Sequence, residues 1–567
     1  MDLESRIKNI SPEESLMLIN STDIDTEGKC WAIKRITNPE ILRNLLKHTD
    51  DPIILKTIIE DTVLLSKENL MDFAFNCKNW KIRLIAVNTW VQDSEFSNVC
   101  REIFDSNQYD NVAFDDVVGV ALNDENKYNR LVAALLIDDE SVLETIALND
   151  AENHVRIAAI SGIVSQDKLV NIIKKNHDRA VLYLASLKIT DESKIIDLIR
   201  TKDNTNVVYV VSQRLDEDRL MELFPTVRVR AQRGIIKNIH NQLFLIDTVY
   251  KEDDGGICLY ACHNIYSQKV LHDIVTDEKL RCKIETFDRF ISFPDDYFYY
   301  DEFLYLTLSL IVDDDLFSDI VFNHPEFKYE FSAAFYILNP SLLADVFLRF
   351  PLNLRDISPK VQITDTEKLF KMALNHPVIE TRIAAAEMIF DKDKLERIIE
   401  NDSTGDVKPY ALRNLNIDES EFSLDADDTL IFIEALKKIR DDAQLLEIFG
   451  KYKNYNIKQA ACENIGDEQI LKDIACTNHL RIASQAINNI ASESILAEIA
   501  LNASFEKVGV YAITKITDNN LLENIFENSS SYCCQINALS RITDENFLED
   551  VSSNNPDEYL KSIAQSR

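Results

Sequence analysis

The chain has 567 residues, a hydrophobic fraction of 46%, and a formal net charge of −35 from 61 basic and 96 acidic residues. Its length exceeds what one hydrophobic core can organise, its apolar content excludes a chain that is disordered throughout, and its acidity argues against direct binding to nucleic-acid phosphates. Gly and Pro number only 10 and 12, which disfavours a turn-rich β fold and favours helices joined by short connections.

Residues 1–29 are expected to form an N-terminal cap. The opening MDLESRIKNISPEESL lacks the basic start and apolar stretch of a signal peptide. The longest apolar runs, such as YLTLSLIV at 305–312, are far shorter than the ~20 residues that span a bilayer. Ten cysteines without a compact pattern are typical of reduced thiols. We therefore expect a cytoplasmic protein without membrane insertion.

Residues 30–291 form the first block of a repeat of about 26 residues. Its most regular position, the anchor, is an apolar residue that closes a helix: Ile36, Ile137, Ile163, Ile189, Leu215, Ile239, Ile265 and Ile291. Ala recurs four residues before the anchor, as at Ala159 and Ala185, so that both side chains share a helix face and neighbouring helices can approach closely.

Two further positions of the repeat predict where its helices begin and end. Thr-Asp pairs follow the anchor at 190–191, 364–365, 517–518 and 543–544, and both residues cap helix N-termini. Asn recurs twelve or thirteen residues after the anchor, as at Asn149, Asn401 and Asn502. Because Asn tolerates the left-handed conformation, we expect each first helix to end on a left-handed Asn.

Residues 292–310 interrupt the repeat with an aromatic-rich junction. Aromatic side chains supply binding hot spots, and flanking acids select a basic partner. The alternative is that bulky residues fill a bend between mis-stacked repeats. The candidate partner-binding residues are Phe293, Asp295, Asp296, Tyr297, Phe298, Tyr299, Tyr300, Phe303 and Tyr305.

Residues 311–555 resume the repeat, and residues 556–567 are expected to be a C-terminal tail. The anchors of this second block are Ile311, Ile337, Ile363, Ile389, Leu415, Ile439, Ile465, Ile490, Ile516 and Ile542. The repeat is less regular in 351–362 and 416–430, which we interpret as degenerate copies and not as separate domains.

The strings HVRIAAISGI (154–163) and TRIAAAEMIF (381–390) resemble the second helix of HEAT and HEAT-like repeats. The resemblance covers most of residues 30–555, although the repeats are shorter than the usual ~40 residues. It implies an all-α, right-handed α-α superhelix (α-solenoid) of about 20 short two-helix HEAT-like repeats, roughly 180 Å along its curve. It does not identify a subfamily.

Four arginines lie seven residues before their anchors: Arg83, Arg130, Arg156 and Arg382. They could form a basic ladder for an acidic ligand. We favour the alternative that each pairs with an Asp or with helix C-terminal carbonyls of a neighbouring repeat.

Metal ligation is weighed at two sets of residues and not predicted at either. Cys258, Cys262 and His263 with Cys282 could bind zinc, but the first two occupy helix positions where small apolar residues are expected. The turn histidines His177, His324, His376 and His479 lie in repeats that are mostly not adjacent, so we interpret them as solvated. No His-Glu pair of the HEAT-repeat hydroxylases, Walker loop or nucleophile elbow occurs.

Long solenoids expose a concave face that can wrap an extended partner. The leading hypothesis is a non-enzymatic protein-binding scaffold or adaptor without a cofactor, whose acidic surface attracts a basic protein partner. The alternative is an inhibitor or immunity-type protein that occludes a basic, nucleic-acid-processing enzyme. A third hypothesis is an enzyme resembling bilin lyases or alkyl-base DNA glycosylases, although the latter need a basic groove.

Overall fold

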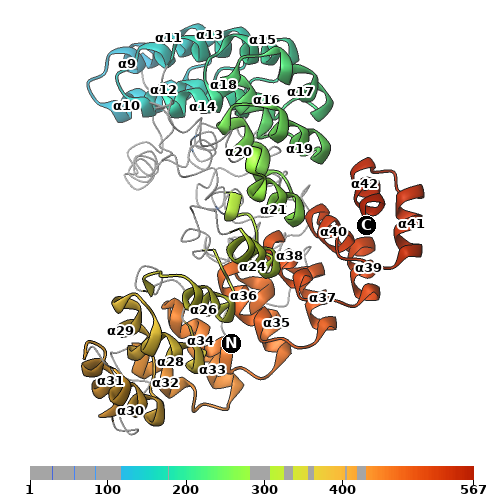
Figure 1. Ribbon diagram of the computed structural model, residues 1–567. Coiled ribbons are helices and arrows are strands. Elements are labelled where there is room, and N and C mark those ends of the chain that lie inside the picture. Colours follow the sequence, from blue (N-terminus) through green and yellow to red (C-terminus); the bar gives the residue numbers. More distant parts are fainter. Residues whose placement is uncertain are drawn as a thin grey trace. The chain divides into compact units, whose positions relative to one another are not determined.

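The computed structural model describes residues 116–176, 178–280, 307–324, 336–354, 363–402, 405–417 and 429–567, with the isolated residues Lys29, Ile33, Thr57 and Leu84. Every regular element in these residues is a helix (Figure 1). The chain divides into two compact parts, which we call unit 1 (before His240) and unit 2 (from His240 onward). The expected all-α fold is confirmed.

Unit 1 consists of helix pairs, in which a first helix and a second helix are joined by a short turn. A 3-10 turn, η1 (Phe224–Thr226), follows α17 in the last pair. The pairs are α9 (Val117–Asn123) with α10 (Lys127–Leu136), α11 (Glu140–Asn149) with α12 (Asn153–Ser161), α13 (Gln166–Lys175) with α14 (Arg179–Leu187), α15 (Glu192–Thr201) with α16 (Thr205–Ser212), and α17 (Glu217–Leu223) with α18 (Val229–Ile236).

Unit 2 continues the same pairing. Four of its helices are described without the other member of their pair: α21 (Gln268–Thr276), α24 (Asp314–Asn323), α26 (Pro340–Arg349) and α32 (Thr429–Leu436). The complete pairs are α19 (Gln242–Lys251) with α20 (Gly255–His263), α28 (Thr366–Asn375) with α29 (Ile379–Glu387), α30 (Lys392–Asn401) with α31 (Lys408–Leu415), α33 (Asp442–Lys451) with α34 (Tyr455–Asn464), α35 (Glu468–Thr477) with α36 (Leu480–Asn488), α37 (Glu493–Asn502) with α38 (Glu506–Thr514), α39 (Asn519–Asn528) with α40 (Tyr532–Leu539), and α41 (Glu545–Asn554) with α42 (Glu558–Ser566).

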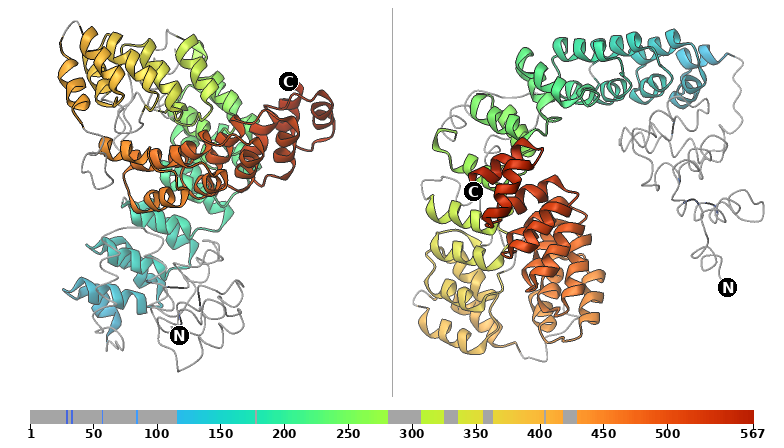
Figure 2. Two further views of the ribbon diagram at one scale, coloured as in Figure 1. Left: turned by 90° about the horizontal axis from the view of Figure 1, so that it is seen from below. Right: turned by 90° about the vertical axis from the view of Figure 1, so that its right-hand side faces the viewer.

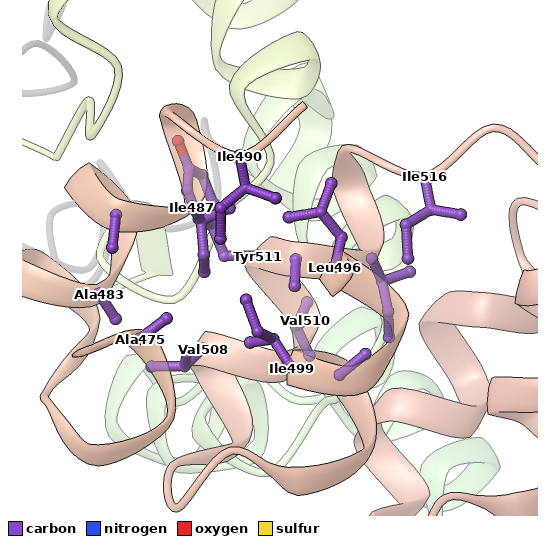
Figure 3. Close-up of a cluster of buried hydrophobic side chains, with 14 of the residues drawn as sticks. Ala475, Ala483, Ile487, Ile490, Leu496, Ile499, Val508, Val510, Tyr511 and Ile516 are labelled. Carbon is purple, nitrogen blue, oxygen red and sulfur yellow. The ribbon is translucent and has the colours of Figure 1, made fainter. Parts of the chain in front are cut away.

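The expected caps and core positions are confirmed. Asp191, Asp365, Asp518 and Asp544 each accept a hydrogen bond from a backbone N–H of the first helical turn, which stabilises a helix by about 1 kcal/mol. The Ala residues before the anchors that the structure describes are buried, and successive second helices pack on them. Figure 3 shows one such core, in which Ile487, Leu496, Ile499 and Val510 converge between α35 and α38.

The prediction that first helices end on a left-handed Asn is wrong. Asn176 and Asn478 have φ of −91° and −112°, and the residues after Asn149 and Asn528 are also extended. The Asn amide instead donates to the carbonyl one turn back, at 2.9 Å from Asn149 to Thr145 and 2.8 Å from Asn502 to Glu498. Asn therefore serves as a side-chain donor at the helix C-terminus, where carbonyl groups lack backbone partners.

A row of polar acceptors, which we call the loop acceptors, holds each repeat to the next. Each is the first residue of a first helix, three residues after an anchor, and accepts from the backbone N–H that follows the next anchor. Gln166 accepts from Thr190 at 2.7 Å and Glu493 from Thr517 at 3.0 Å. The other members are Glu140, Gln242, Gln268, Asp442, Glu468 and Asn519.

The loop acceptors also define the length of each repeat. Their bonds span 24 residues in most repeats, but Gln268 on α21 bonds the N–H of Val312 at 2.6 Å, across 44 residues. The bond from α21 therefore reaches the backbone that follows the anchor Ile311. The expected anchor Ile291 lies outside the described residues.

Unit 2 also doubles back on itself. The core around α33–α42 includes Val312, and Tyr266 and Leu338 pack against it, although they precede it by about 100 residues or more. The Gln485 amide nitrogen donates to the Leu338 carbonyl oxygen at 3.2 Å. Figure 2 shows the orange and red helices of this second run beside the yellow-green helices of the first. Repeats of unit 2 thus contact distant repeats as well as their neighbours, which the sequence analysis did not anticipate.

The residues expected as a C-terminal tail complete the last repeat. They form α42, in which Tyr559, Leu560 and Ala564 are buried. Among the helices that the structure describes, none has the length and apolar character needed to cross a bilayer.

Candidate functional site

The candidate partner-binding residues predicted from the sequence, between Phe293 and Tyr305, lie outside the described residues. What the structure establishes is the frame on either side of them. Before them, α21 carries the loop acceptor Gln268; after them, Leu308 and Ile311 are buried. In the chain, the aromatic stretch therefore lies between two described residues, Gln268 and Val312, that are bonded to one another.

The arginine ladder binds within the protein, in agreement with the favoured interpretation. Each described arginine pairs with an Asp of the following repeat: Arg130 with Asp150 at 2.8 Å, Arg156 with Asp178 at 4.0 Å and Arg382 with Asp406 at 3.9 Å. Arg83 lies outside the described residues. The hydrogen bonds that the Arg130 guanidinium donates to Asp150 raise the pKa of Arg130, so this side chain forms a structural ion pair.

The cysteines of α20 behave as small core residues. Cys258 and Cys262 are buried, and the Cys258 thiol faces the carbonyl oxygens of Val249 and Glu252. His263 is exposed, and its Nδ1 lies 3.0 Å from the carbonyl of Leu259 on its own helix. These three side chains do not converge, and Cys282 lies outside the described residues.

Five side chains join the two runs of unit 2, and we call them the return contact: Asp313, Asp314, Tyr511, Lys515 and Arg541. Asp313 caps α24, and Asp314 is the first residue of that helix. Lys515 Nζ lies 2.5 Å from Asp314 Oδ2, and Arg541 Nη1 donates to Asp313 Oδ2 at 3.3 Å. The Tyr511 hydroxyl lies 3.0 Å from Asp314 Oδ2. Side chains from two successive repeats of the second run thus bind the N-terminus of α24, which belongs to the first run.

Lys515 and Arg541 occupy a repeat position whose side chain has a different hydrogen-bond partner in other repeats. It is the residue just before the anchor, and elsewhere its side chain donates to carbonyls at the end of the preceding second helix. Lys188 donates to Ser161 at 2.6 Å, Arg214 to Leu187 at 2.9 Å and Asn414 to Glu387 at 2.8 Å. In the return contact the same position reaches a distant repeat instead.

The electrostatics of the return contact favour specificity over stability. Burial raises the pKa of Asp313, and the Arg541 guanidinium acts in the opposite direction. Burial followed by the nearby Asp314 charge raises the pKa of Tyr511, so its hydroxyl is a donor at neutral pH. Removing such charges from water costs free energy that their pairing must offset. The return contact is therefore suited to fixing which repeats meet.

A second set of polar bonds extends the same interface to α21 and the residues before it. The Asn537 amide nitrogen donates to the Tyr266 carbonyl at 2.8 Å, and its oxygen accepts from the Gln268 N–H at 3.1 Å. The Tyr266 and Tyr532 rings meet edge to face, with centroids 6.1 Å apart. Gln268 thus contacts both the next anchor and the distant α40.

The interpretation of the turn histidines as solvated is wrong for His376, whereas His479 is exposed as expected and His324 is partly exposed. His376 is buried, and its Nε2 lies 3.0 Å from the Phe350 carbonyl. His479 packs on Phe505 with ring centroids 4.3 Å apart. His324 follows α24 and faces His272 of α21 and Asp319 of its own helix. His177 lies outside the described residues.

Ion pairs between adjacent repeats use many of the basic side chains on the first helices. Most are partly exposed and stabilise the fold only slightly. They include Glu144–Lys168 at 3.3 Å, Lys174–Asp197 at 2.9 Å, Glu367–Lys394 at 3.0 Å and Lys472–Glu498 at 2.8 Å.

The first helices of the last two repeats, α39 and α41, contain acids and neither Lys nor Arg. The same is true of α11, α24 and α37, but an acid of each of those helices pairs with a lysine of another repeat: Glu144 with Lys168, Asp314 with Lys515 and Glu498 with Lys472. We call Glu523, Glu527, Glu545, Glu549 and Asp550 the acidic face. Partial burial, and then repulsion from Asp544, Glu527 and Asp518, raises the pKa of Glu523. Like charges on this face are therefore not neutralised by basic neighbours among the described residues.

The geometry of both units is that of stacked two-helix repeats with buried Ala and Ile positions and polar bonds from each repeat to the next. Both units are α-solenoids built from two-helix repeats. No family model matches the chain, and no curated protein is similar to it.

Solved structures with some similarity include a mutant of Kap121p at 10% identity, covering 100% of this chain and 67% of that one with a TM-score of 0.24. Importin beta is similar at 10% identity over 100% and 74% of the two chains, with a TM-score of 0.19. Another Kap121p structure has 12% identity, coverage of 100% and 82%, and a TM-score of 0.22. With TM-scores this low, the fold assignment rests on the repeats themselves.

Proposed function

We propose that the chain is a non-enzymatic scaffold or adaptor that binds a protein partner with a basic surface. The observation that carries this proposal is the acidic face, where five carboxylates on α39 and α41 have no basic side chain on either helix. A net charge of −35 extends the same preference over the molecule. Such a surface attracts basic partners at rates that fall as salt rises.

The test compares two sets of substitutions that change net charge equally. Glu523→Gln, Glu527→Gln and Glu549→Gln neutralise the acidic face. Asp393→Asn, Glu396→Gln and Glu400→Gln neutralise three exposed acids of α30, a helix that also carries Lys and Arg. Proteins captured from a lysate of the native source by the wild-type chain should be lost with the first set and retained with the second.

Equal capture by both triple variants would refute the role of the acidic face. Captured proteins that are basic nucleic-acid-processing enzymes and lose activity on capture would favour the inhibitor hypothesis over the scaffold. If the chain shifts the mobility of DNA at low salt, the proposal is contradicted, because an acidic binding surface should repel nucleic-acid phosphates.

The aromatic stretch is proposed as a second part of the partner surface. Its composition supports this proposal, because aromatic side chains supply binding hot spots and the flanking acids favour a basic partner. Replacing Tyr297, Tyr299 and Tyr300 by Ala should abolish partner capture while the helical circular dichroism signal is unchanged. Undiminished capture by this folded variant would remove residues 293–305 from the site.

A further inference from the structure

Three side chains that can bind a metal meet between α21 and α24, the first helices of successive repeats. They are His272, Asp319 and His324, whose ligating atoms all lie within 4.8 Å of one another. Asp319 Oδ2 is 2.8 Å from His272 Nε2 and 3.4 Å from His324 Nε2. The two imidazole rings are nearly perpendicular, with centroids 6.3 Å apart. Both rings thus direct a nitrogen at one carboxylate oxygen.

Neighbouring polar groups orient two of these side chains. The Asn323 amide donates to Asp319 Oδ1 at 2.7 Å, which leaves Oδ2 for the histidines. His272 Nδ1 lies 3.3 Å from Asp273 Oδ1, and Lys269 holds Asp273 at 2.8 Å. Histidines that bind metals almost always give their other ring N–H to such a carboxylate, which fixes the ring and its tautomer.

The two carboxylates around His272 create a requirement for positive charge. A neutral imidazole has one N–H, so if Nδ1–H faces Asp273, the Nε2 lone pair faces the oxygen of Asp319 at 2.8 Å. A cation near Nε2 relieves this repulsion. His324 places a second ring nitrogen beside the same Asp319 oxygen, as a shared metal ion requires.

We propose that His272, Asp319 and His324 bind a divalent transition metal of the zinc class and thereby link α21 to α24. Imidazole and carboxylate ligands suit zinc and its neighbours in the first transition row. Three protein ligands leave one position of a tetrahedral site for water. The side chains of His324 and Asp319 are 27% and 38% exposed, so solvent and metal can reach the site, whereas His272 is 7% exposed and anchors it.

The ligand atoms require only a small adjustment to bind one ion. Metal–ligand bonds of about 2.0–2.1 Å place tetrahedral ligand atoms about 3.3 Å apart, and two of the three separations are already 2.8 and 3.4 Å. The remaining movement falls to His324, which lies just after α24 and is therefore not held by helix geometry. A bound ion would fix the two described helices that precede and follow residues 281–306 in the chain.

The experiment uses the full chain after treatment with a chelator. Titration with Co2+ should give the visible absorption of a tetrahedral site at one equivalent, and Zn2+ should displace it and raise the Tm. His324→Ala and Asp319→Asn should each remove this absorption and the Tm increase. Asp273→Asn should weaken Co2+ binding by about 10–100-fold, as loss of an outer hydrogen-bond partner does. His263→Ala, which removes an exposed histidine of the same unit, should change neither.

The partly exposed positions of Asp319 and His324 make both variants expected to fold, and circular dichroism checks this. The proposal is overturned if wild-type chain and folded His324→Ala bind Co2+ with equal affinity and stoichiometry. It is also overturned if Zn2+ leaves the wild-type Tm unchanged.

Discussion

Tyr511 and Asp314 lie 197 residues apart in the chain, yet the tyrosine hydroxyl is 3.0 Å from the Asp314 carboxylate. Tyr511 is fully buried and also lies 2.7 Å from the Asn488 side-chain oxygen. Repeat arrays normally make contacts only between neighbours. This pair therefore couples two distant parts of unit 2 that a simple solenoid would leave independent.

Replacing Tyr511 by Phe should lower the free energy of unfolding by about 1–2 kcal/mol, because Asp314 loses a buried donor while the ring volume is kept. The loss of stability should be concentrated in the two segments that the hydrogen bond joins. Amide hydrogen exchange should accelerate in residues 309–316 as well as in α38. Chemical denaturation and exchange measured by mass spectrometry check these two expectations.

The matched control is Tyr532→Phe, which removes a tyrosine–aspartate hydrogen bond of 2.7 Å to Asp557 in the adjacent repeat. It should destabilise α40–α42 without changing exchange in residues 309–316. If Tyr511→Phe also leaves that segment protected, the return contact does not couple the two runs.

The repeat could be predicted from the sequence because its signals are local. Ala159 and Ile163 lie four residues apart on one helix, and Asp191 caps the helix that begins next to it. The return contact could not be predicted in this way. Lys515 and Arg541 occupy the position from which Lys188 bonds the preceding repeat, and nothing local marks the different partner.

The histidine cluster was missed for a different reason. A constant step of about 26 residues places a repeat boundary at Ile291 and separates the repeats of His272 and His324. The bond from Gln268 to Val312 joins α21 to the residues just before α24, and the two helices are in contact. The polar residue three positions after each anchor could have revealed this contact, because it bonds the backbone N–H that follows the next anchor.

Close packing of α16 against α18 depends on Gly234. A Cβ atom there would lie 2.8 Å from the Thr205 carbonyl oxygen and from Val208 Cβ. Gly234→Ala should therefore destabilise unit 1 by about 1–3 kcal/mol, because the two helices must separate. Gly450→Ala on α33 is the control, since a Cβ there meets nothing within 4 Å. Gly450→Ala should stabilise the protein by about 0.5–1 kcal/mol through helix propensity. Denaturant unfolding measures the free energy of unfolding of both variants. If Gly234→Ala leaves that free energy unchanged, the close packing of α16 against α18 does not depend on Gly234.

The loop acceptor Glu493 makes a contribution to stability that depends on pH. Hydrogen bonds from the Thr517 hydroxyl and from the Asp518 and Thr517 N–H groups lower its pKa, against partial burial. A carboxyl whose pKa is lower in the folded state stabilises the fold above its ordinary value of about 4.3 and loses that contribution as pH falls through the folded pKa. Wild type should thus exceed Glu493→Gln in Tm at pH 7, and the difference should shrink at pH 3.

Gln166 provides the control for this titration, because it is an uncharged acceptor at the same repeat position. Gln166→Ala should lower the Tm by a similar amount at both pH values. A Glu493→Gln difference that stays constant between pH 7 and pH 3 would show that the charge of Glu493 contributes nothing.

Two cysteines of adjacent repeats should differ in reactivity because they differ in burial. Burial raises the pKa of Cys462 on α34 to about 12, whereas Cys476 on α35 is partly exposed, with a pKa that burial also raises. Thiolate is the reactive form, so iodoacetamide at pH 8 should modify Cys476 in the folded chain and Cys462 only after unfolding. Peptide mass spectrometry over time separates the two sites. Modification at equal rates below the unfolding transition would mean that α34 does not bury Cys462 as the stacked repeats require.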